Sequence, residues 1–366
     1  MKNVEKFITH NLSNWKELLA EKPYCIKVTQ YGPYYMLKYS QIDSDFSLPI
    51  VQECRGLIIR FYGEILKIVC HPFDKFFNYG EANMADLDWK NGVQASEKVD
   101  GSLIKFWFDL GKWHISTNGT IDAYKAEANS AIGVTFGELV EQGIHAMGMS
   151  LEEFYSGLDK SYTHMFELVS PLTRVVIPYK ETKLYYLTSR SNWMSFCGYY
   201  HFFDSAYNYP KDYGNYNSIE QLLPIVEKMD WQHEGLVLFD GINRIKLKSP
   251  AYVLAHYARA NGNVSKKHLI KVILEGEEAE FLAYAEEYKD ALYKIKYKMD
   301  VLEQAAKSLY LEAITFKDKK SLAMYLKSVA PALAGYAFKA YDNLPHYLSW
   351  KDYTSSWDAA KWEKIV

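Results

Sequence analysis

Apolar residues recur every three or four positions near both ends of the chain, and they alternate with polar residues in between. Residues 4–19 have helical spacing, which predicts one amphipathic helix. From about residue 24 to 110, short β-rich runs are separated by turns. GLIIRFYGEILKIVC predicts a hairpin through 62–64, and LIKFWFDLGKWHIS predicts another through 109–112. Residues 122–147 carry Ala, Glu and Leu at helical spacing, so we expect a helix there.

In the second half of the chain, the sequence pattern changes from strand-like to helical near residue 250. Strand-like runs are present at HMFELVS, KLYYLTSR and GLVLFDGINRIKLK, the last with an Asp-Gly turn. Beyond this point the segments 266–284, 286–313 and 319–342 have apolar residues every three or four positions. The pattern predicts two domains, a mixed domain over 1–255 and a helical domain over 256–366.

Composition places the chain among ordinary globular proteins, with 49% hydrophobic and 24% charged residues over 366 positions. No apolar run reaches the roughly 20 residues that span a bilayer, so we expect no membrane association. The four cysteines (Cys25, Cys54, Cys70 and Cys197) lack C-x-x-C spacing, which argues against a zinc site and favours a reduced, cytoplasmic protein. A net charge of −3 argues against indiscriminate binding of polyanions but allows a locally basic cleft.

The segment EKVDGSLIKF at 97–106 is the sharpest chemical feature of the chain. A lysine, a polar turn and an apolar strand would place Lys98 at the mouth of a sheet. Lysine is a nucleophile only when it is neutral, so its pKa would have to fall through burial or nearby cations. Taken alone, K-x-D-G is a weak motif, and a surface hairpin turn is the commoner interpretation.

Other segments fit the same chemistry. EGLVLF places Glu234 at the head of a buried strand, and RIKLKS follows with Lys246 and Lys248 two positions apart, on one side of a strand. Two ammonium groups on one face repel each other unless a polyanion such as a triphosphate lies between them. In FELVS, Glu167 interrupts an apolar strand, where a carboxylate is costly without a partner.

Two upstream segments add cations. ECRGL supplies Arg55, and DKFFNYGE supplies Lys75 with Phe76 and Phe77. For each of these cations alone, a surface salt bridge is the commoner interpretation, but within the set of segments it is not.

The ordered set ECRG, KFFN, KxDGSL, FELVSPLTRVVIPY, EGLV and KLKS resembles the adenylyltransferase domain of the T-even bacteriophage RNA ligase 1 family, over about residues 45–280. That family belongs to the covalent nucleotidyltransferases, as do DNA ligases and mRNA capping enzymes. The resemblance implies an α+β fold: an antiparallel-sheet nucleotidyltransferase (ATP-grasp-like ligase) domain followed by an all-α C-terminal domain. KxDG, EGLV and KLK are common to the superfamily, whereas ECRG, KFFN and SPLTRVVIPY point to this family.

Carried over position by position, the resemblance implies a role for each matched residue. Lys98 would form the phosphoramide bond to AMP, and Glu167 would contact the ribose. Glu234 would hold a divalent ion, Mg²⁺ or Mn²⁺, with Glu275 of VILEGEE as a second metal ligand. The remaining implied nucleotide-binding residues are Lys246 and Lys248 at the α-phosphate, Arg55 and Lys75 at the outgoing pyrophosphate, Phe77 and the strand 183–190 as pocket wall, and Glu97, Asp100, Gly101 and Gly235 beside the motif residues.

The chain departs from the family pattern in two places. Asn118 in TNGT stands where the family has a basic residue before Gly-Ser/Thr, so a contact to phosphate or RNA would be weaker or supplied by another residue. Where the family has a tyrosine close to the nucleotide, the matching position here is either Lys38 or Tyr39. Neither change removes a residue that covalent chemistry needs.

The implied activity is ATP-dependent RNA ligation (polyribonucleotide ligase). Lys98 attacks ATP, AMP passes to an RNA 5′-phosphate, and an RNA 3′-hydroxyl then displaces AMP. We expect a monomer that acts in RNA repair, with nicked tRNA as one candidate substrate. A DNA ligase or a capping enzyme would place a small β-barrel after the last lysine motif, and the helical texture beyond 250 counts against both. A catalytically inactive nucleic-acid-binding relative is the third alternative, and the retained lysine and carboxylates argue against it.

Overall fold

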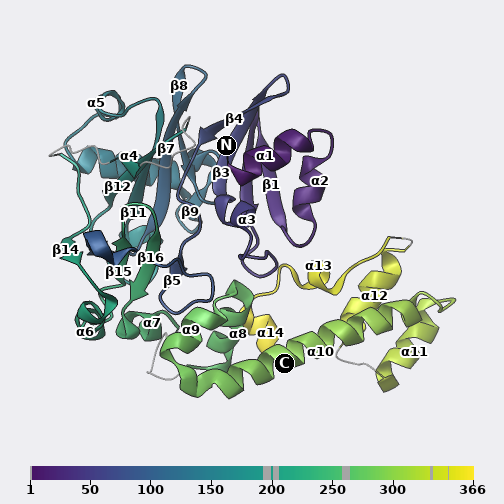
Figure 1. The fold of residues 1–366 in the computed structure, drawn as a ribbon. Helices are drawn as coiled ribbons and strands as arrows, with labels where there is room; N and C mark the ends of the chain where they lie inside the picture. Colours follow the sequence, from purple (N-terminus) through teal and green to yellow (C-terminus); the bar gives the residue numbers. More distant parts are fainter. Residues whose placement is uncertain (1, 193–198, 201–205, 258–263, 330–332, 345) are drawn as a thin grey trace. The chain divides into compact units, whose positions relative to one another are not determined.

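The computed structural model describes residues 2–192, 199–200, 206–257, 264–329, 333–344 and 346–366 (Figure 1). The chain divides into two compact units, an N-terminal unit Met1–His256 and a C-terminal unit Tyr257–Val366. The predicted α+β architecture is confirmed, with sheets in the first unit and helices in the second. No helix of the described ranges combines the length and apolarity that crossing a bilayer requires.

The N-terminal unit begins with two helices and a four-stranded antiparallel sheet. Helices α1 (Asn3–His10), α2 (Trp15–Ala20) and α3 (Pro49–Glu53) share a core with β1 (Ile26–Tyr31), β2 (Tyr34–Tyr39), β3 (Arg55–Tyr62) and β4 (Ile65–Cys70). The single helix predicted over 4–19 is therefore wrong, because the helix stops before Asn11. The Asn11 side chain donates to the Phe7 carbonyl at 2.8 Å, and polar side chains of this kind favour turns over helix interiors.

A five-stranded sheet in the order β13-β12-β11-β7-β8 forms one wall of the site. Its strands are β7 (Ser102–Asp109), β8 (Lys112–Thr117), β11 (Tyr162–Val169), β12 (Lys183–Ser191) and β13 (Tyr199–Tyr200). Helices α4 (Phe136–Ala146) and α5 (Leu151–Ser156) supply residues to the core on one of its faces. Side chains of β7 and β11 therefore point to both faces of the sheet. Phe106 and Phe166 enter this core, while Leu103 and Met165 pack with Phe73 on the opposite face.

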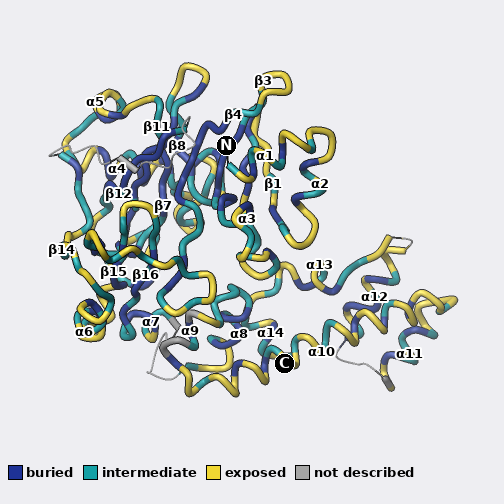
Figure 2. The backbone as a smooth tube through the Cα atoms, in the orientation of Figure 1, coloured by how far each residue is buried: buried dark blue, intermediate teal, exposed yellow. Residues whose placement is uncertain are grey.

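A second five-stranded sheet, ordered β14-β6-β15-β16-β5, forms the other wall. It contains β5 (Phe77–Asn78), β6 (Val93–Glu97), β14 (Asp212–Tyr216), β15 (Gly235–Phe239) and β16 (Arg244–Lys248). All of its pairings are antiparallel except β16 with β5. Its core face packs against α6 (Leu223–Glu227), so β6, β15 and β16 contain both dark blue and teal residues in Figure 2, whereas β14 at the edge has no buried residue.

The segment 122–147 differs from the predicted helix. It contains a 3₁₀ turn at Ala123–Lys125, a small hairpin of β9 (Glu127–Asn129) and β10 (Val134–Thr135), and only then α4. The helix starts where Thr135 and Glu138 form a capping box. This four-residue signal marks the true helix start in the sequence.

Beyond Lys248, every regular element that the structure describes is a helix. They are α7 (Pro250–Tyr257), α8 (Lys266–Glu275), α9 (Glu278–Tyr284), a 3₁₀ turn (Glu286–Tyr288), α10 (Lys289–Ala313), α11 (Lys319–Val329), α12 (Ala334–Asp342), α13 (Trp350–Thr354) and α14 (Ala359–Glu363). The helical segments predicted over 266–342 are thus confirmed.

Candidate active site

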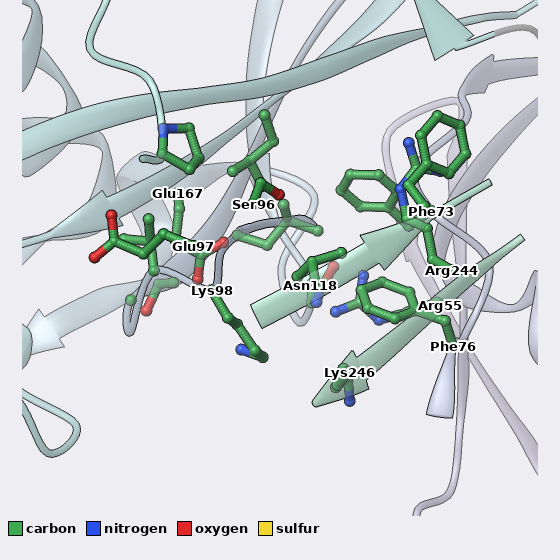
Figure 3. Close-up of a pocket in the computed structure, with 18 of the residues that line it drawn as sticks. Arg55, Phe73, Phe76, Ser96, Glu97, Lys98, Asn118, Glu167, Arg244 and Lys246 are labelled. Carbon is green, nitrogen blue, oxygen red and sulfur yellow. The ribbon is translucent and has the colours of Figure 1, made fainter. Parts of the chain in front are cut away.

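A cavity of about 480 Å³ lies between the two five-stranded sheets of the N-terminal unit (Figure 3). Strand alternation decides which side chains reach it. In β16, Ile245 and Leu247 enter the core of the sheet, whereas Arg244 and Lys246 line the cavity. The other lining residues from the two walls include Gln94, Ser96, Glu97, Leu103, Glu167, Leu187, Val237 and Phe239. The prediction that the strand 183–190 helps to wall the pocket therefore has a structural counterpart in Leu187.

Lys98 follows β6 and is fixed at the cavity by its own backbone. Its N–H donates to the Gly235 carbonyl at 2.9 Å, which ties the end of β6 to the start of β15. Its Nζ lies 2.7 Å from Oε1 of Glu234, and Nζ of Lys248 lies 3.4 Å from the same oxygen. Glu234 is only 5% exposed, so three charged groups from separate segments meet at one buried point. Part of the motif set predicted from sequence is thus assembled by the fold.

The glycines next to these residues permit close packing. A Cβ on Gly101 would lie 2.4 Å from the Leu168 carbonyl oxygen, so only glycine lets the turn after Lys98 approach β11. Gly235 has φ +131°, and a Cβ there would lie 2.2 Å from the Leu247 carbonyl oxygen. These contacts explain Gly101 and Gly235 by packing.

Asp100 is buried and already occupied by protein groups. One carboxylate oxygen accepts from the backbone N–H groups of Val176 and Ile177 at 2.9 and 2.8 Å, and the other accepts from the Tyr252 hydroxyl at 2.7 Å. The carboxylate therefore ties the turn after Lys98 to the SPLTRVVIPY segment and to α7. Its geometry suits a residue that positions Lys98 better than one that binds nucleotide directly.

Glu167 projects from β11 into the cavity and is half-buried. Burial raises the pKa of its carboxyl to about 7, and the negative charges of Glu234 and Asp100 act in the same direction, whereas Lys98 and Arg55 oppose the shift. Glu167 is therefore a carboxyl group whose charge is poorly compensated by the protein alone. A bound cation or hydroxyl group would compensate it.

Arg55 and Asn118 line the cavity and carry unused hydrogen-bonding capacity. Nη1 of Arg55 and Oδ1 of Asn118 are buried and have no hydrogen-bond partner among the described residues. The Arg55 guanidinium also lies 5.8 Å from the centre of the Phe76 ring. Buried polar atoms of this kind usually have partners, so their presence in a cavity indicates a ligand that supplies them.

Lys75 and Phe77 lie elsewhere than the sequence suggested. Neither lines the cavity, and the residue between them, Phe76, does. The Phe77 ring is buried 6.1 Å from the Phe46 ring, and Lys75 Nζ lies 4.3 Å from the centre of the Phe46 ring. Adjacent residues of an extended segment point to opposite sides, so the predicted pocket wall moves by one position to Phe76.

The remaining predicted residues are spread more widely. Lys38 is exposed, with Nζ near Gly119, while the Tyr39 ring packs against Phe46, so neither lines the cavity. Glu275 ends α8 in the C-terminal unit and pairs with Lys271 at 3.5 Å. Of the cysteines, Cys25, Cys54 and Cys70 are free thiols, and Cys197 lies outside the described residues.

Several cavity residues were missed by the sequence reasoning. Arg244 lies two residues before Lys246 on the same face of β16, and its guanidinium carbon is 3.8 Å from the centre of the Phe239 ring. The alternation that paired Lys246 with Lys248 also includes Arg244, so the signal was available. Phe73 and Phe76, in the loop after β4, also line the cavity. The sequence named Phe76 beside Lys75 but assigned the pocket wall to Phe77, and it did not indicate Phe73.

The donor set fits a divalent cation only in part. Across the described ranges no three His, Cys, Asp or Glu side chains cluster as a ready metal cage. Glu167 and Glu234 do lie close enough for the charge of one to raise the pKa of the other. Mg²⁺ typically takes one or two carboxylates and completes its shell with water and substrate phosphate, which suits these two residues.

A family model described as RNA ligase, of the T4 ligase 1 type, matches residues 53–252, more than half of the chain. The chain belongs to the RNA ligase family. The matched segment holds Lys98, Glu167 and Lys246, which line the cavity, and Glu234 and Lys248, which meet beside Lys98. The family predicted from the ordered motifs is therefore confirmed.

Two curated relatives agree with this family. A protein of Autographa californica nuclear polyhedrosis virus, whose name proposes a bifunctional polynucleotide kinase/RNA ligase, is 32% identical over 70% of this chain and 38% of its own length. An RNA ligase of Rhodothermus phage RM378 is 29% identical over 44% of this chain and 42% of its own length. The chain thus matches about two fifths of the length of each of these relatives.

Among solved structures, an archaeal ATP-dependent RNA ligase is similar over 86% of both chains, with a TM-score of 0.41 and 12% identity. At this level the similarity carries no argument about activity.

Proposed function

We propose that this protein is an ATP-dependent RNA ligase that forms a covalent lysyl-AMP on Lys98. The observation that carries the proposal is the buried junction at which Lys98 and Lys248 both meet Glu234, at 2.7 and 3.4 Å. An amine at the edge of a nucleotide-sized cavity, with carboxylates and further cations beside it, suits attack on a phosphorus atom.

The first step is the attack of the Lys98 amine on the α-phosphorus of ATP. A new N–P bond forms, the bond to the bridging oxygen breaks, and pyrophosphate leaves. The amine has to lose a proton, and Glu234 Oε1 is an acceptor at 2.7 Å. Lys246 and Lys248 would then stabilise charge on the α-phosphate, with Arg55 at the outer phosphates.

A divalent ion, Mg²⁺ or Mn²⁺, would be held by Glu234 and Glu167 together with the phosphates, and would neutralise charge on the phosphoryl group. Glu167 would have a second role beside metal binding. Glu167, half-buried in the cavity, would also accept a hydrogen bond from a hydroxyl group of the ribose.

The next two steps use RNA. An RNA 5′-phosphate oxygen takes the adenylyl group from Lys98, and an RNA 3′-hydroxyl then attacks the activated phosphate and releases AMP. Each step is a phosphoryl displacement in which positioning supplies much of the rate. We propose the C-terminal unit as the part that recognises the RNA, with a monomer acting on a nicked tRNA as the finer hypothesis.

Strands of 5′-phosphorylated RNA test this proposal. With ATP and Mg²⁺, the protein should convert them to a 5′-adenylated intermediate and then to a joined product. Strands that lack the 5′-phosphate should give neither, and DNA strands should react poorly. Efficient joining of nicked duplex DNA, or transfer of GMP to a 5′-diphosphate end, would assign the protein to the DNA ligase or capping class.

A further inference from the structure

Lys105 is a buried lysine in the middle of β7. Its side chain is completely inaccessible to solvent, although lysine is rarely buried unless it is paired. Its Nζ donates to the Gly56 carbonyl oxygen at 2.6 Å, and over the described ranges it makes no ion pair with a carboxylate. An ammonium group has three N–H donors, and the Gly56 carbonyl oxygen accepts one of them. Without a carboxylate partner among the described residues, the positive charge of Lys105 is not neutralised by the protein.

The neighbours of Lys105 add positive charge. Burial, together with the positive charges of Arg55 and Lys38, lowers the pKa of Lys105 to about 8, and only a negative charge on Cys70 would oppose this shift. Burial in turn raises the pKa of Cys70, so this thiol is neutral near pH 7 and supplies no negative charge. Lys105, Arg55 and Lys38 therefore form a cluster of three cations near the end of β8.

The cluster lies directly behind the cavity wall. Gly56 has φ +76°, and a Cβ there would lie 2.8 Å from Lys105 Nζ and 3.0 Å from the Asn118 carbonyl oxygen. The start of β3, the end of β8 and the Lys105 ammonium thus converge at Gly56. Arg55 and Asn118 line the cavity, while Lys105 does not. Figure 3 shows the two cavity-lining side chains, Arg55 and Asn118.

Arg55 and Asn118 also carry buried atoms, Nη1 and Oδ1, that have no hydrogen-bond partner among the described residues. Their positions depend on the backbone that Lys105 holds, because Gly56 directly follows Arg55 and packs on Asn118. A buried charge is strongest where water is excluded and its position is fixed. The arrangement is therefore prepared for an anion that the protein itself does not supply.

We propose that Lys105, assisted by Lys38, is a positioning residue for the phosphates of the nucleotide: it fixes Arg55 and Asn118 from behind and adds positive charge that a bound polyphosphate balances. This inference rests on the proposed function, because it takes the cavity to be the ATP site. It assigns a task to two cations that lie outside the cavity lining.

The alternative is a lysine that only fills space and holds two strands together. Methionine matches the length and volume of the lysine side chain, so Lys105→Met removes the charge and the hydrogen bond while keeping most of the packing. If the role is structural only, binding of every ligand in the cavity should weaken in parallel. If the role is electrostatic, only ligands with phosphates should be affected.

The experiment measures the ATP concentration that half-saturates formation of the lysyl-adenylate, and in parallel the inhibition of that reaction by adenosine, which has no phosphate. For Lys105→Met, the ATP concentration should rise about 10-fold to 100-fold, less than the roughly 10²–10³-fold loss for a direct contact. The adenosine inhibition constant should stay within about twofold of wild type. The matched control is Lys67→Met, which removes a cation of β4 that is paired with Asp109 at 2.9 Å, and it should leave both values unchanged.

Lys38→Met provides a second variant that does not depend on replacing a buried residue. It removes an exposed charge of the same cluster, so the half-saturating ATP concentration should rise about 2-fold to 5-fold. The adenosine inhibition constant should not change. If Lys105→Met does not fold, Lys38→Met alone tests whether the cluster contributes to ATP binding. An unchanged ATP value for Lys38→Met would then overturn the proposed cluster.

A last arm separates the two sources of phosphate. On purified enzyme-adenylate, the dependence on RNA 5′-phosphate concentration should be the same for wild type and Lys105→Met. A change here with unaltered ATP values would mean that the cluster serves the RNA phosphate, and would overturn the assignment to ATP. Parallel losses for ATP and adenosine would also overturn it. If the wild-type protein forms no adenylate at all, the proposed function fails, and the outcome is distinct from failure of this inference.

Discussion

Glu167→Gln should stabilise the protein above pH 7 while lowering its activity. The carboxyl pKa of Glu167 is raised by burial to about 7 from 4.5. In the unfolded chain the group loses its proton near pH 4.5, whereas the folded protein retains it until about pH 7, so stability falls across this interval as pH rises. Glutamine resembles the protonated acid and avoids this loss.

The size of the effect follows from the two pKa values. Their difference, converted at about 1.36 kcal/mol per pH unit, gives an upper limit of about 3 kcal/mol. Glu167 is only half-buried, and glutamine also loses the attraction to Lys98 and Arg55. We therefore expect a net gain of about 1–2 kcal/mol at pH 8, or about 3–6 °C in Tm.

Thermal unfolding of both proteins at pH 5 and pH 8 measures this effect. The gain of Glu167→Gln should be small at pH 5 and fully developed at pH 8, while lysyl-adenylate formation falls roughly 10²-fold. Glu181→Gln is the control, because Glu181 is exposed, its pKa is lowered by Lys183, and its replacement should destabilise slightly if at all. A Glu167→Gln protein that is less stable than wild type at pH 8, or equally shifted at both pH values, would refute the reasoning.

Three further predictions concern other parts of the chain. Lys246→Ala should lose about 10²–10³-fold in adenylylation, whereas Glu275→Ala, outside the N-terminal unit, should lose much less; equal losses in the two purified variants would contradict the assignment. Gly101→Ala should lower Tm and adenylylation together, because its Cβ would lie 2.4 Å from the Leu168 carbonyl oxygen, and unchanged values would argue against this contact. A chain ending at residue 265 should still form the adenylate if circular dichroism shows it to be folded, but should seal a structured RNA less well than a short single strand; equal losses on both RNAs would assign a general catalytic role to the helices.

Strand alternation explains why much of the site could be predicted from the sequence. The pattern of RIKLKS alone determines where its side chains point, because apolar residues at alternate positions turn the lysines to the other face of β16. Glu234 and Glu167 were identified because a carboxylate at the head of, or within, an apolar strand needs a partner, and the structure places both beside Lys98. Side-chain direction along a strand depends on local sequence alone, so patterns of this kind can be read before the structure is known.

Contacts between distant segments could not be predicted in this way. Phe76 replaces Phe77 in the cavity because the direction of a loop after β4 decides which of two adjacent rings points inward. Lys105 appears in the sequence as an ordinary polar residue of a strand, and its role depends on Gly56, almost fifty residues earlier. The break at Asn11 shows a third case, in which a side chain competes with the helix that periodicity predicts.

Formation of the covalent adenylate on Lys98 tests the central claim most directly. Wild-type protein and Lys98→Ala are incubated with α-labelled ATP and Mg²⁺, denatured, and analysed for label that stays with the protein and is labile to acid but stable to alkali. The account predicts labelled wild type and unlabelled Lys98→Ala. Equal labelling of the two proteins, or no label on wild type with either ATP or GTP, would contradict it.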